Sequence, residues 1–256
     1  KQPILQARLL DALGQIYRLR GHYPEAESLF REALGLRLDR LGERHLDVAE
    51  TRYHLGLVLS EKDAYVEAEE HLQNALATYR RSVGPQDLRT ALVLEELAIV
   101  HRTRGDLVGA EARLRELVDS YRATPGDVDT GLATALLFLG KVLLEQGRFE
   151  ESEPHLREAL SIQRRLYGAD HPAVANALDG LGELAHAQSD FAGAEEYYRD
   201  AYAIRQRLYE DGHSDFSASF TNLGIVLHDQ GRYDEAEPLL REALAIARSS
   251  FGEQHG

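Results

Sequence analysis

A fixed spacing of 42 residues is the feature that most constrains the fold of this chain. A Leu followed by Gly or Ala recurs at that spacing six times, without an insertion. These pairs begin at Leu13, Leu55, Leu97, Leu139, Leu181 and Leu223. A fixed period of about 20–50 residues is the signature of a repeat architecture, in which each unit packs only on its neighbours. The chain is therefore predicted to be an array of six units.

Two further landmarks keep the same spacing within each unit. A residue typical of turns follows the Leu by eight positions, and a small residue joined to Glu follows five positions later. The turn positions are Gly21, Asp63, Gly105, Gly147, Ser189 and Gly231. The small residues before Glu are Ala26, Ala68, Ala110, Ser152, Ala194 and Ala236.

Each unit reads as helix, short turn, helix and long loop. Apolar residues between Asp47 and Lys62 recur at helical spacing, and so do those between Tyr65 and Tyr79, while strand signals are absent. An all-α single domain over residues 1–256 is predicted. Its repeats are expected at roughly 5–42, 47–84, 89–126, 131–168, 173–210 and 215–252.

Glycine recurs in the middle of the first helix of most units, at Gly14, Gly56, Gly140, Gly182 and Gly224. Glycine costs about 1 kcal/mol relative to alanine in a helix interior, so a repeated glycine needs a packing reason. We expect the two helices of a pair to approach closely there. Ala26 and its equivalents on the second helix are the expected facing residues.

Composition excludes several kinds of protein. Cysteine is absent, which excludes disulfides, zinc–thiolate sites and cysteine nucleophiles. No apolar run of about 18 residues and no signal-peptide pattern is present, so we expect no membrane partner and a cytoplasmic location. A net charge of −14 argues against nucleic acid, whose binding needs clustered cations.

One stretch imitates a cofactor motif. Gly180-Leu181-Gly182-Glu183-Leu184-Ala185 fits the pattern G-x-G-x-x-A of dinucleotide-binding loops. That motif works only between a strand and a helix, whereas this stretch lies inside a predicted helix. No cofactor is therefore expected, and His171-Pro172 just before it is interpreted as the turn that starts the helix.

The repeat pattern resembles the tetratricopeptide repeat, in the 42-residue variety found in kinesin light chains and many bacterial signalling proteins. The motif's second half matches GRYDEAEPLLREAL at residues 231–244, and its long inter-repeat loop matches GADHPAVA at residues 168–175. The resemblance implies a right-handed superhelical solenoid of six helix-turn-helix repeats. It also implies a protein–protein interaction scaffold, because the family mainly binds other proteins.

Within that family, the first helix of each pair lines a concave groove that binds the partner. The positions that the resemblance assigns to the groove are Tyr53, His54, Leu57, Leu92, Glu95, Glu96, Ile99, Arg102, Leu137, Phe138, Lys141, Leu144, Asp179, Glu183 and Asn222. Acidic residues outnumber basic ones in the wider groove, and its middle is apolar. A protein or peptide partner with basic and apolar character is therefore expected.

Two binding modes known in the family are disfavoured. A clamp for a terminal carboxylate needs Lys or Arg with Asn, but Arg8 and Lys141 have acidic neighbours. The kinesin light chain mode uses asparagines along the first helix, and only Asn176 and Asn222 fall at suitable places.

A metal-binding or enzymatic site is the alternative to a scaffold. Its best case is Glu183 and His186 beside His228, because the two histidines occupy adjacent first helices and both residue types bind zinc. Surface histidines in an acidic groove explain the same residues without a metal.

The two ends of the array carry apolar residues that a further repeat would normally cover. They include Ile4, Leu9, Leu10 and Leu13 at one end and Leu239, Leu240, Leu244, Ile246 and Phe251 at the other. The chain starts without Met, stops in an inter-repeat loop, and has 26 Arg against 3 Lys. We expect a fragment of a larger bacterial protein, in which repeats or a domain adjoin, with self-association through the uncapped C-terminal repeat as the other outcome.

Overall fold

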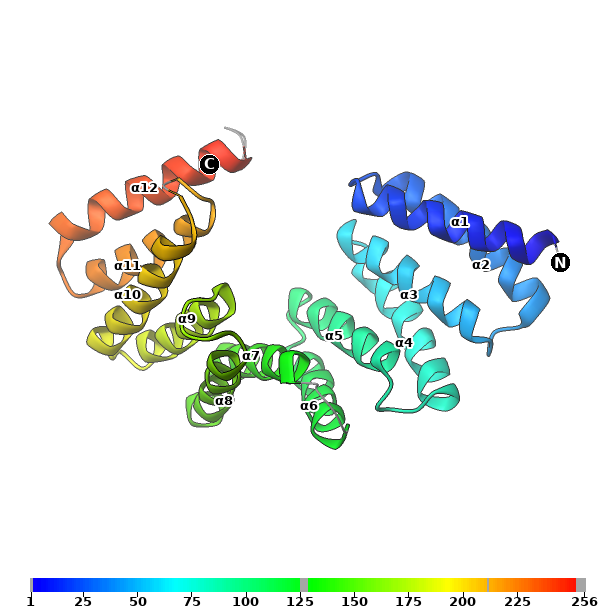
Figure 1. The fold of residues 1–256 in the computed structure, drawn as a ribbon, viewed down its shortest axis with the longest axis horizontal. Helices are drawn as coiled ribbons and strands as arrows, with labels where there is room; N and C mark the ends of the chain where they lie inside the picture. Colours follow the sequence, from blue (N-terminus) through cyan, green and yellow to red (C-terminus); the bar gives the residue numbers. More distant parts are fainter. Residues whose placement is uncertain (1, 125–128, 211, 252–256) are drawn as a thin grey trace. The chain divides into compact units, whose positions relative to one another are not determined.

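The computed structural model describes residues 2–124, 129–210 and 212–251, which form twelve α-helices and no strand (Figure 1). The first six are α1 (Gln2–Leu19), α2 (Tyr23–Leu41), α3 (Leu46–Glu61), α4 (Tyr65–Ser82), α5 (Leu88–Thr103) and α6 (Leu107–Ala123). The others are α7 (Asp129–Glu145), α8 (Phe149–Tyr167), α9 (Pro172–Ala187), α10 (Phe191–Leu208), α11 (Asp215–Asp229) and α12 (Tyr233–Phe251). The all-α fold of six helix-turn-helix repeats is confirmed.

The helices pack in chain order inside two compact units, residues 1–126 and 127–256. The two helices of every repeat contact each other, as Figure 1 shows. Within these units, the second helix of one repeat also contacts the first helix of the next, in the pairs α2–α3, α4–α5, α8–α9 and α10–α11. First helices of neighbouring repeats touch as well, α1 with α3, α3 with α5 and α7 with α9. A single domain over the whole chain stays a prediction.

The short turn inside each repeat depends on one residue with a left-handed backbone. Gly21, Gly105, Gly147 and Gly231 have φ between 74° and 78°, and Asp63 and Ser189 have φ of 59° and 64°. A left-handed residue ends a helix sharply, and glycine adopts that conformation without a steric cost. All six predicted turn positions are therefore confirmed.

The long loops end on a side chain that caps the next first helix. The rings of His45, His171 and His213 each accept a hydrogen bond from the backbone N–H two residues later, at 3.1–3.2 Å. Asp87 does the same with its carboxylate at 3.0 Å. These bonds satisfy donors that a helix start leaves free. His171-Pro172 is thus a helix start, as predicted from the sequence.

The mid-helix glycines make room for large side chains, which corrects the expectation that they face small ones. A Cβ at Gly182 would lie 2.5 Å from the Tyr198 ring, and one at Gly56 would lie 2.7 Å from Leu72. The Ala68 carbonyl oxygen is farther, at 3.5 Å. The small residue before Glu lies one helical turn earlier than the residue that fills the space. Spacing along one helix does not show which turn of the partner lies opposite.

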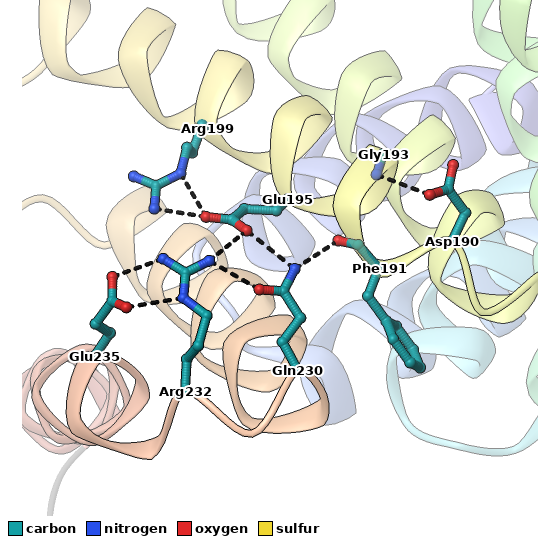
Figure 2. A network of polar contacts seen from close by, with 8 residues as sticks. All are labelled: Asp190, Phe191, Gly193, Glu195, Arg199, Gln230, Arg232 and Glu235. Carbon is teal, nitrogen blue, oxygen red and sulfur yellow. Dashed lines mark hydrogen bonds and ion pairs between the residues drawn. The ribbon is translucent and has the colours of Figure 1, made fainter.

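At three junctions, a carboxylate on the second helix of one repeat joins that repeat to the next. Figure 2 shows Glu195 of α10 between Arg199 on its own helix and two side chains from the turn after α11. Glu195 accepts hydrogen bonds from Gln230 at 3.0 Å and from Arg232 at 2.7 Å. Burial alone would raise the pKa of Glu195, but hydrogen bonds from Arg199 and Gln230 outweigh it and the pKa lies below its usual value.

The same contact recurs in the first unit. Lys62 binds Glu27 at 2.5 Å, and Arg104 binds Glu69. The hydrogen bond from Lys62 is the largest influence on the pKa of Glu27 and holds it below its usual value. At Glu27, Glu69 and Glu195, the Glu of the small-residue–Glu landmark therefore holds the turn of the following repeat.

Two buried arginines add a second link between repeats. Arg37 donates to Thr51 and to the Asp47 carbonyl oxygen, and Arg205 donates to Ser219 at 2.9 Å. Each also faces an aspartate of its own repeat, Asp11 at 3.5 Å and Asp179 at 2.6 Å. Burying a charge is costly unless it is paired. The contacts of each arginine with its own repeat and with the next one therefore fix how the two repeats stack.

Glycine 182 provides a direct test of this packing. We expect Gly182→Ala to lower the free energy of unfolding by about 1–2 kcal/mol, because its Cβ would overlap the buried Tyr198 ring. Urea denaturation followed by circular dichroism measures the change. The control is Gly35→Ala, also within a helix, where a Cβ meets nothing within 4 Å. This variant should be neutral or up to about 1 kcal/mol more stable. Equal losses in the two variants would contradict the packing role.

Candidate functional site

The predicted groove residues of the first unit lie together on α3 and α5. We call this set, Tyr53, His54, Leu57, Leu92, Glu95, Glu96, Ile99 and Arg102, the first-helix surface of unit 1. Each of these side chains is at least partly accessible, and Leu92, Ile99 and Arg102 are exposed. Contact between α3 and α5 places the residues on α3 beside those on α5.

The helical period explains why these residues share a face. Leu92, Glu95, Glu96 and Ile99 follow one another at steps of three, one and three, which places them on one stripe of α5. The other stripe, with Val93, Leu94, Leu97 and Val100, is fully buried. The helices of the repeat therefore pack through the buried stripe, and Leu92 and Ile99 remain exposed outside it.

The carboxylates on this surface lack a cationic partner. Neither Glu95 nor Glu96 forms an ion pair among the described residues. Burial raises the pKa of both carboxyl groups, and at Glu96 it outweighs a hydrogen bond with Ser60 and the charge of Arg18, which act in the opposite direction. Burial and, secondarily, the charges of Glu96 and Glu95 raise the pKa of the Tyr53 hydroxyl to about 12. The surface is thus acidic and partly desolvated, a combination that is also found at functional sites.

His54 connects the surface to the interior. Its Nδ1 lies 3.4 Å from Asp11 Oδ2, and its ring packs at centroid distances of 5.5 Å on Phe30 and 5.7 Å on Tyr53. Asp11 in turn faces the buried Arg37. His54 is therefore held in place mainly by structural contacts, and only its edge reaches the surface.

A small pocket of about 150 Å³ opens beside these residues. Its lining combines three residues of the sequence-based list, Tyr53, His54 and Leu92, with Glu50, Tyr79 and Arg89. Tyr79 and Arg89 were not predicted, because Tyr79 comes from the second helix and Arg89 from the start of α5. Arg89 is held by two hydrogen bonds to Asp87, of 2.8 and 2.9 Å. The pocket is smaller than a typical small-molecule site and has room for one side chain.

The predicted residues of the second unit are placed differently. Leu137 and Leu144 pack against the buried cluster around α9, and Phe138 is half-buried. Lys141 and Glu183 bind each other at 2.9 Å between α7 and α9. Asn222 of α11 is half-buried. Most of these side chains are thus committed to internal contacts.

Asp179 is the groove candidate that the structure places farthest from solvent. It is buried, and its Oδ2 accepts a hydrogen bond of 2.6 Å from the buried Arg205. Arg205 also binds Asn176 at 2.9 Å. The aspartate therefore balances a buried charge.

The histidines of the metal hypothesis share one carboxylate. His186 Nε2 lies 2.7 Å from Asp229 Oδ2, and His228 Nδ1 lies 2.9 Å from Asp229 Oδ1. Glu183, the third proposed ligand, binds Lys141 instead. Within the described residues, no three His, Cys, Asp or Glu side chains are arranged to hold a metal ion.

Sequence comparison agrees with this architecture along most of the chain. Profiles described as tetratricopeptide repeat match residues 9–44, 47–123, 131–207 and 217–255. The chain belongs to the tetratricopeptide repeat family. None of the curated proteins matches it in sequence.

Solved structures with the same fold include kinesin light chain-like repeats. The nearly identical repeats of the putative kinesin light chain of Podosopora anserina have a TM-score of 0.71 at 18% identity, covering 80% of this chain and 97% of that one. BtubC (BKLC) from P. vanneervenii has 0.68 at 22% identity, covering 100% and 93%. The apo form of RapI has 0.71 at 15% identity, covering 94% and 97%. At these identities the likeness shows the tetratricopeptide solenoid and nothing finer.

None of the described helices of this tetratricopeptide array has the length and apolar character needed to cross a membrane.

The raised pKa of Glu96 predicts a pH-dependent stability. Its folded pKa lies above the unfolded one, so the folded chain binds more protons between the two values. The free energy of unfolding contributed by this group therefore falls as pH rises through that window. We expect Glu96→Gln to raise the urea midpoint at pH 7, and the gain to vanish below the usual glutamate pKa. The exposed Glu50→Gln on α3 is the control and should show no gain. A Glu96→Gln gain that is independent of pH would contradict the assignment.

The buried pair in the second unit predicts a separate effect on stability. Asp179→Asn leaves the Arg205 charge buried without a counter-charge, so the free energy of unfolding should fall by about 3 kcal/mol. Glu183→Gln removes only the more accessible pair with Lys141 and should cost less than about 1 kcal/mol. Urea denaturation measures both variants. Similar costs for the two would show that Asp179 has no structural role.

Proposed function

We propose that this tetratricopeptide array is a protein-interaction scaffold that binds an extended or helical segment of a partner along the first-helix surface of unit 1. The observation that carries the proposal is the exposed pair Leu92 and Ile99 beside Glu95 and Glu96, two carboxylates that form no ion pair among the described residues. Internal packing explains neither feature. Membership of a family that mainly binds proteins supports the same function.

The chemistry of the surface defines the class of partner. Apolar side chains on the partner would cover Leu57, Leu92 and Ile99, while Lys or Arg would neutralise Glu95 and Glu96. An uncompensated, partly desolvated carboxylate gains most from a cation that arrives with its own apolar surroundings. We therefore infer a basic and apolar segment, and we assign the chain the recognition part of a larger signalling protein in the cytoplasm, without catalytic activity of its own.

The pocket beside Tyr53 supplies an anchor for this mode of binding. Its volume of about 150 Å³ accommodates a single side chain, and Glu50, Tyr53 and Tyr79 line it with polar groups. Interfaces depend on a few side chains that fill such pockets near their centre. A residue of the partner would enter here while its neighbours lie along α5.

The test is a peptide library in which Lys or Arg alternates with Leu, Ile or Phe, with acidic and wholly polar libraries alongside. We expect the basic–apolar library to yield binders whose affinity falls as salt is raised. Leu92→Ala and Ile99→Ala should each weaken binding by about 1–3 kcal/mol, measured by isothermal titration calorimetry. Leu137 is not a suitable probe, because it packs on the core.

Val66→Ala and Val108→Ala are the matched controls, since both valines are exposed on second helices. They should leave affinity unchanged. If these controls abolish binding while Leu92→Ala and Ile99→Ala do not, or if acidic peptides bind best, the proposed surface is wrong.

A further inference from the structure

The first and last helices that the structure describes, α1 and α12, expose faces that the repeats between them bury. On α1, Leu13 and Ile16 are 46% and 48% exposed. Their equivalents in repeats 2, 3, 5 and 6 are at most 4% exposed: Leu55, Leu97, Leu181, Leu223, Val58, Val100, Leu184 and Val226. In those repeats the second helix of the preceding repeat packs against the first helix. We call Leu9, Leu13 and Ile16 the head face.

A matching face lies on α12. Leu240 and Leu244 are 36% and 43% exposed, whereas their equivalents in repeats 1, 2 and 4 are at most 8% exposed: Phe30, Leu72, Leu156, Leu34, Leu76 and Leu160. A groove of about 440 Å³ runs along this helix, lined in part by Ala236, Leu240 and Leu244. We call these three residues the tail face.

We infer that the head face of one copy of this chain docks on the tail face of another, so that α1 and α12 form an intermolecular junction like those between repeats. The junction between α10 and α11 provides the template. There, Leu223 and Val226 pack with Ala194 and Tyr198 in one buried cluster. Leu13 and Ile16 on the head face are the equivalents of Leu223 and Val226. Ala236 and Leu240 on the tail face are the equivalents of Ala194 and Tyr198.

Charged residues at the two ends complement each other in the same register. Arg20 occupies the position of Lys62 and Arg104, and Glu237 occupies that of Glu27 and Glu69, to which those cations bind. A second pair follows from Arg31 and Glu67, which lie 2.7 Å apart and correspond to Arg241 and Glu25. The docked copies would thus repeat two ion pairs that already join repeats inside the chain.

Steric fit favours the same partner. Where the second helix carries Arg37 or Arg205, the next first helix offers Thr51 or Ser219 as an acceptor. At the tail this position is Ala247, and at the head its counterpart is Leu9. A large apolar residue therefore meets a small one, and no charge is buried without a partner. The fit of head to tail involves none of the residues of the proposed peptide-binding surface.

A head-to-tail contact is open-ended, because each copy that joins leaves a new head and a new tail free. Sedimentation velocity over a wide range of protein concentration should therefore show species that grow beyond a dimer. Ile16→Glu removes the head face and Leu244→Glu removes the tail face. Each variant alone should be monomeric, with association weakened by about tenfold or more.

Mixing the two variants decides the geometry. The intact tail of Ile16→Glu can still bind the intact head of Leu244→Glu, so the mixture should form a heterodimer and nothing larger. The heterodimer also shows that both variants are folded. Leu88→Glu, at an exposed position on α5, is the matched control and should associate like the unmodified chain.

Several results would overturn the inference. They are an unmodified chain that stays monomeric at every concentration, a mixture without a heterodimer, and a control that also loses association. If Leu244→Glu alone abolishes association while Ile16→Glu has no effect, the contact joins two tails instead. Peptide binding by the first-helix surface would be unaffected by any of these results, so the two proposals fail separately.

Discussion

The structure depends on the covering of each helix pair by the next one. A repeat has two apolar faces, and its own two helices cover only part of each. Where α3, α5, α9 and α11 follow a second helix, their inward leucines, Leu55, Leu97, Leu181 and Leu223, are almost completely buried. Stability in such an array is the sum of weak units and strong junctions, so it is the junction that selection must maintain. That requirement explains one landmark of the sequence, the Glu that binds the next turn. The glycine that admits a large side chain instead packs the two helices of its own repeat.

Much of the fold is predictable because every junction repeats the same spacing. The period of 42 residues locates the helices, and the turn positions require a left-handed residue in each repeat. The prediction of the glycine's partner was wrong for a physical reason. Helix spacing specifies which residues share a face, but the crossing of two helices decides which turn of the partner comes opposite. Gly56 meets Leu72, one turn beyond Ala68, and nothing in the spacing distinguishes the two.

The candidate site was less predictable, because first-helix positions that are equivalent in sequence have different neighbours. Asp179 was assigned to the groove by its register alone. Its burial depends on Arg205, 26 residues later on another helix. Tyr53 and Glu95 occupy the position of Asp179 in the second and third repeats. In those repeats the position of Arg205 is occupied by Tyr79 and Tyr121. A resemblance to a family transfers positions, whereas the partner across the helix pair decides whether a position is available for binding.

That difference separates residues that hold the array together from residues free to recognise something else. In the first and fifth repeats this position is Asp11 or Asp179, and a buried arginine balances its charge. In the third repeat Glu95 has no such cation, and burial raises its pKa, as it also raises that of the adjacent Glu96. The chain itself shows that an Asp–Arg pair fits this place, so the unpaired carboxylates are not forced by the fold. A polar group kept at a cost in stability, beside exposed Leu92 and Ile99, is better explained by a partner that supplies the missing cation.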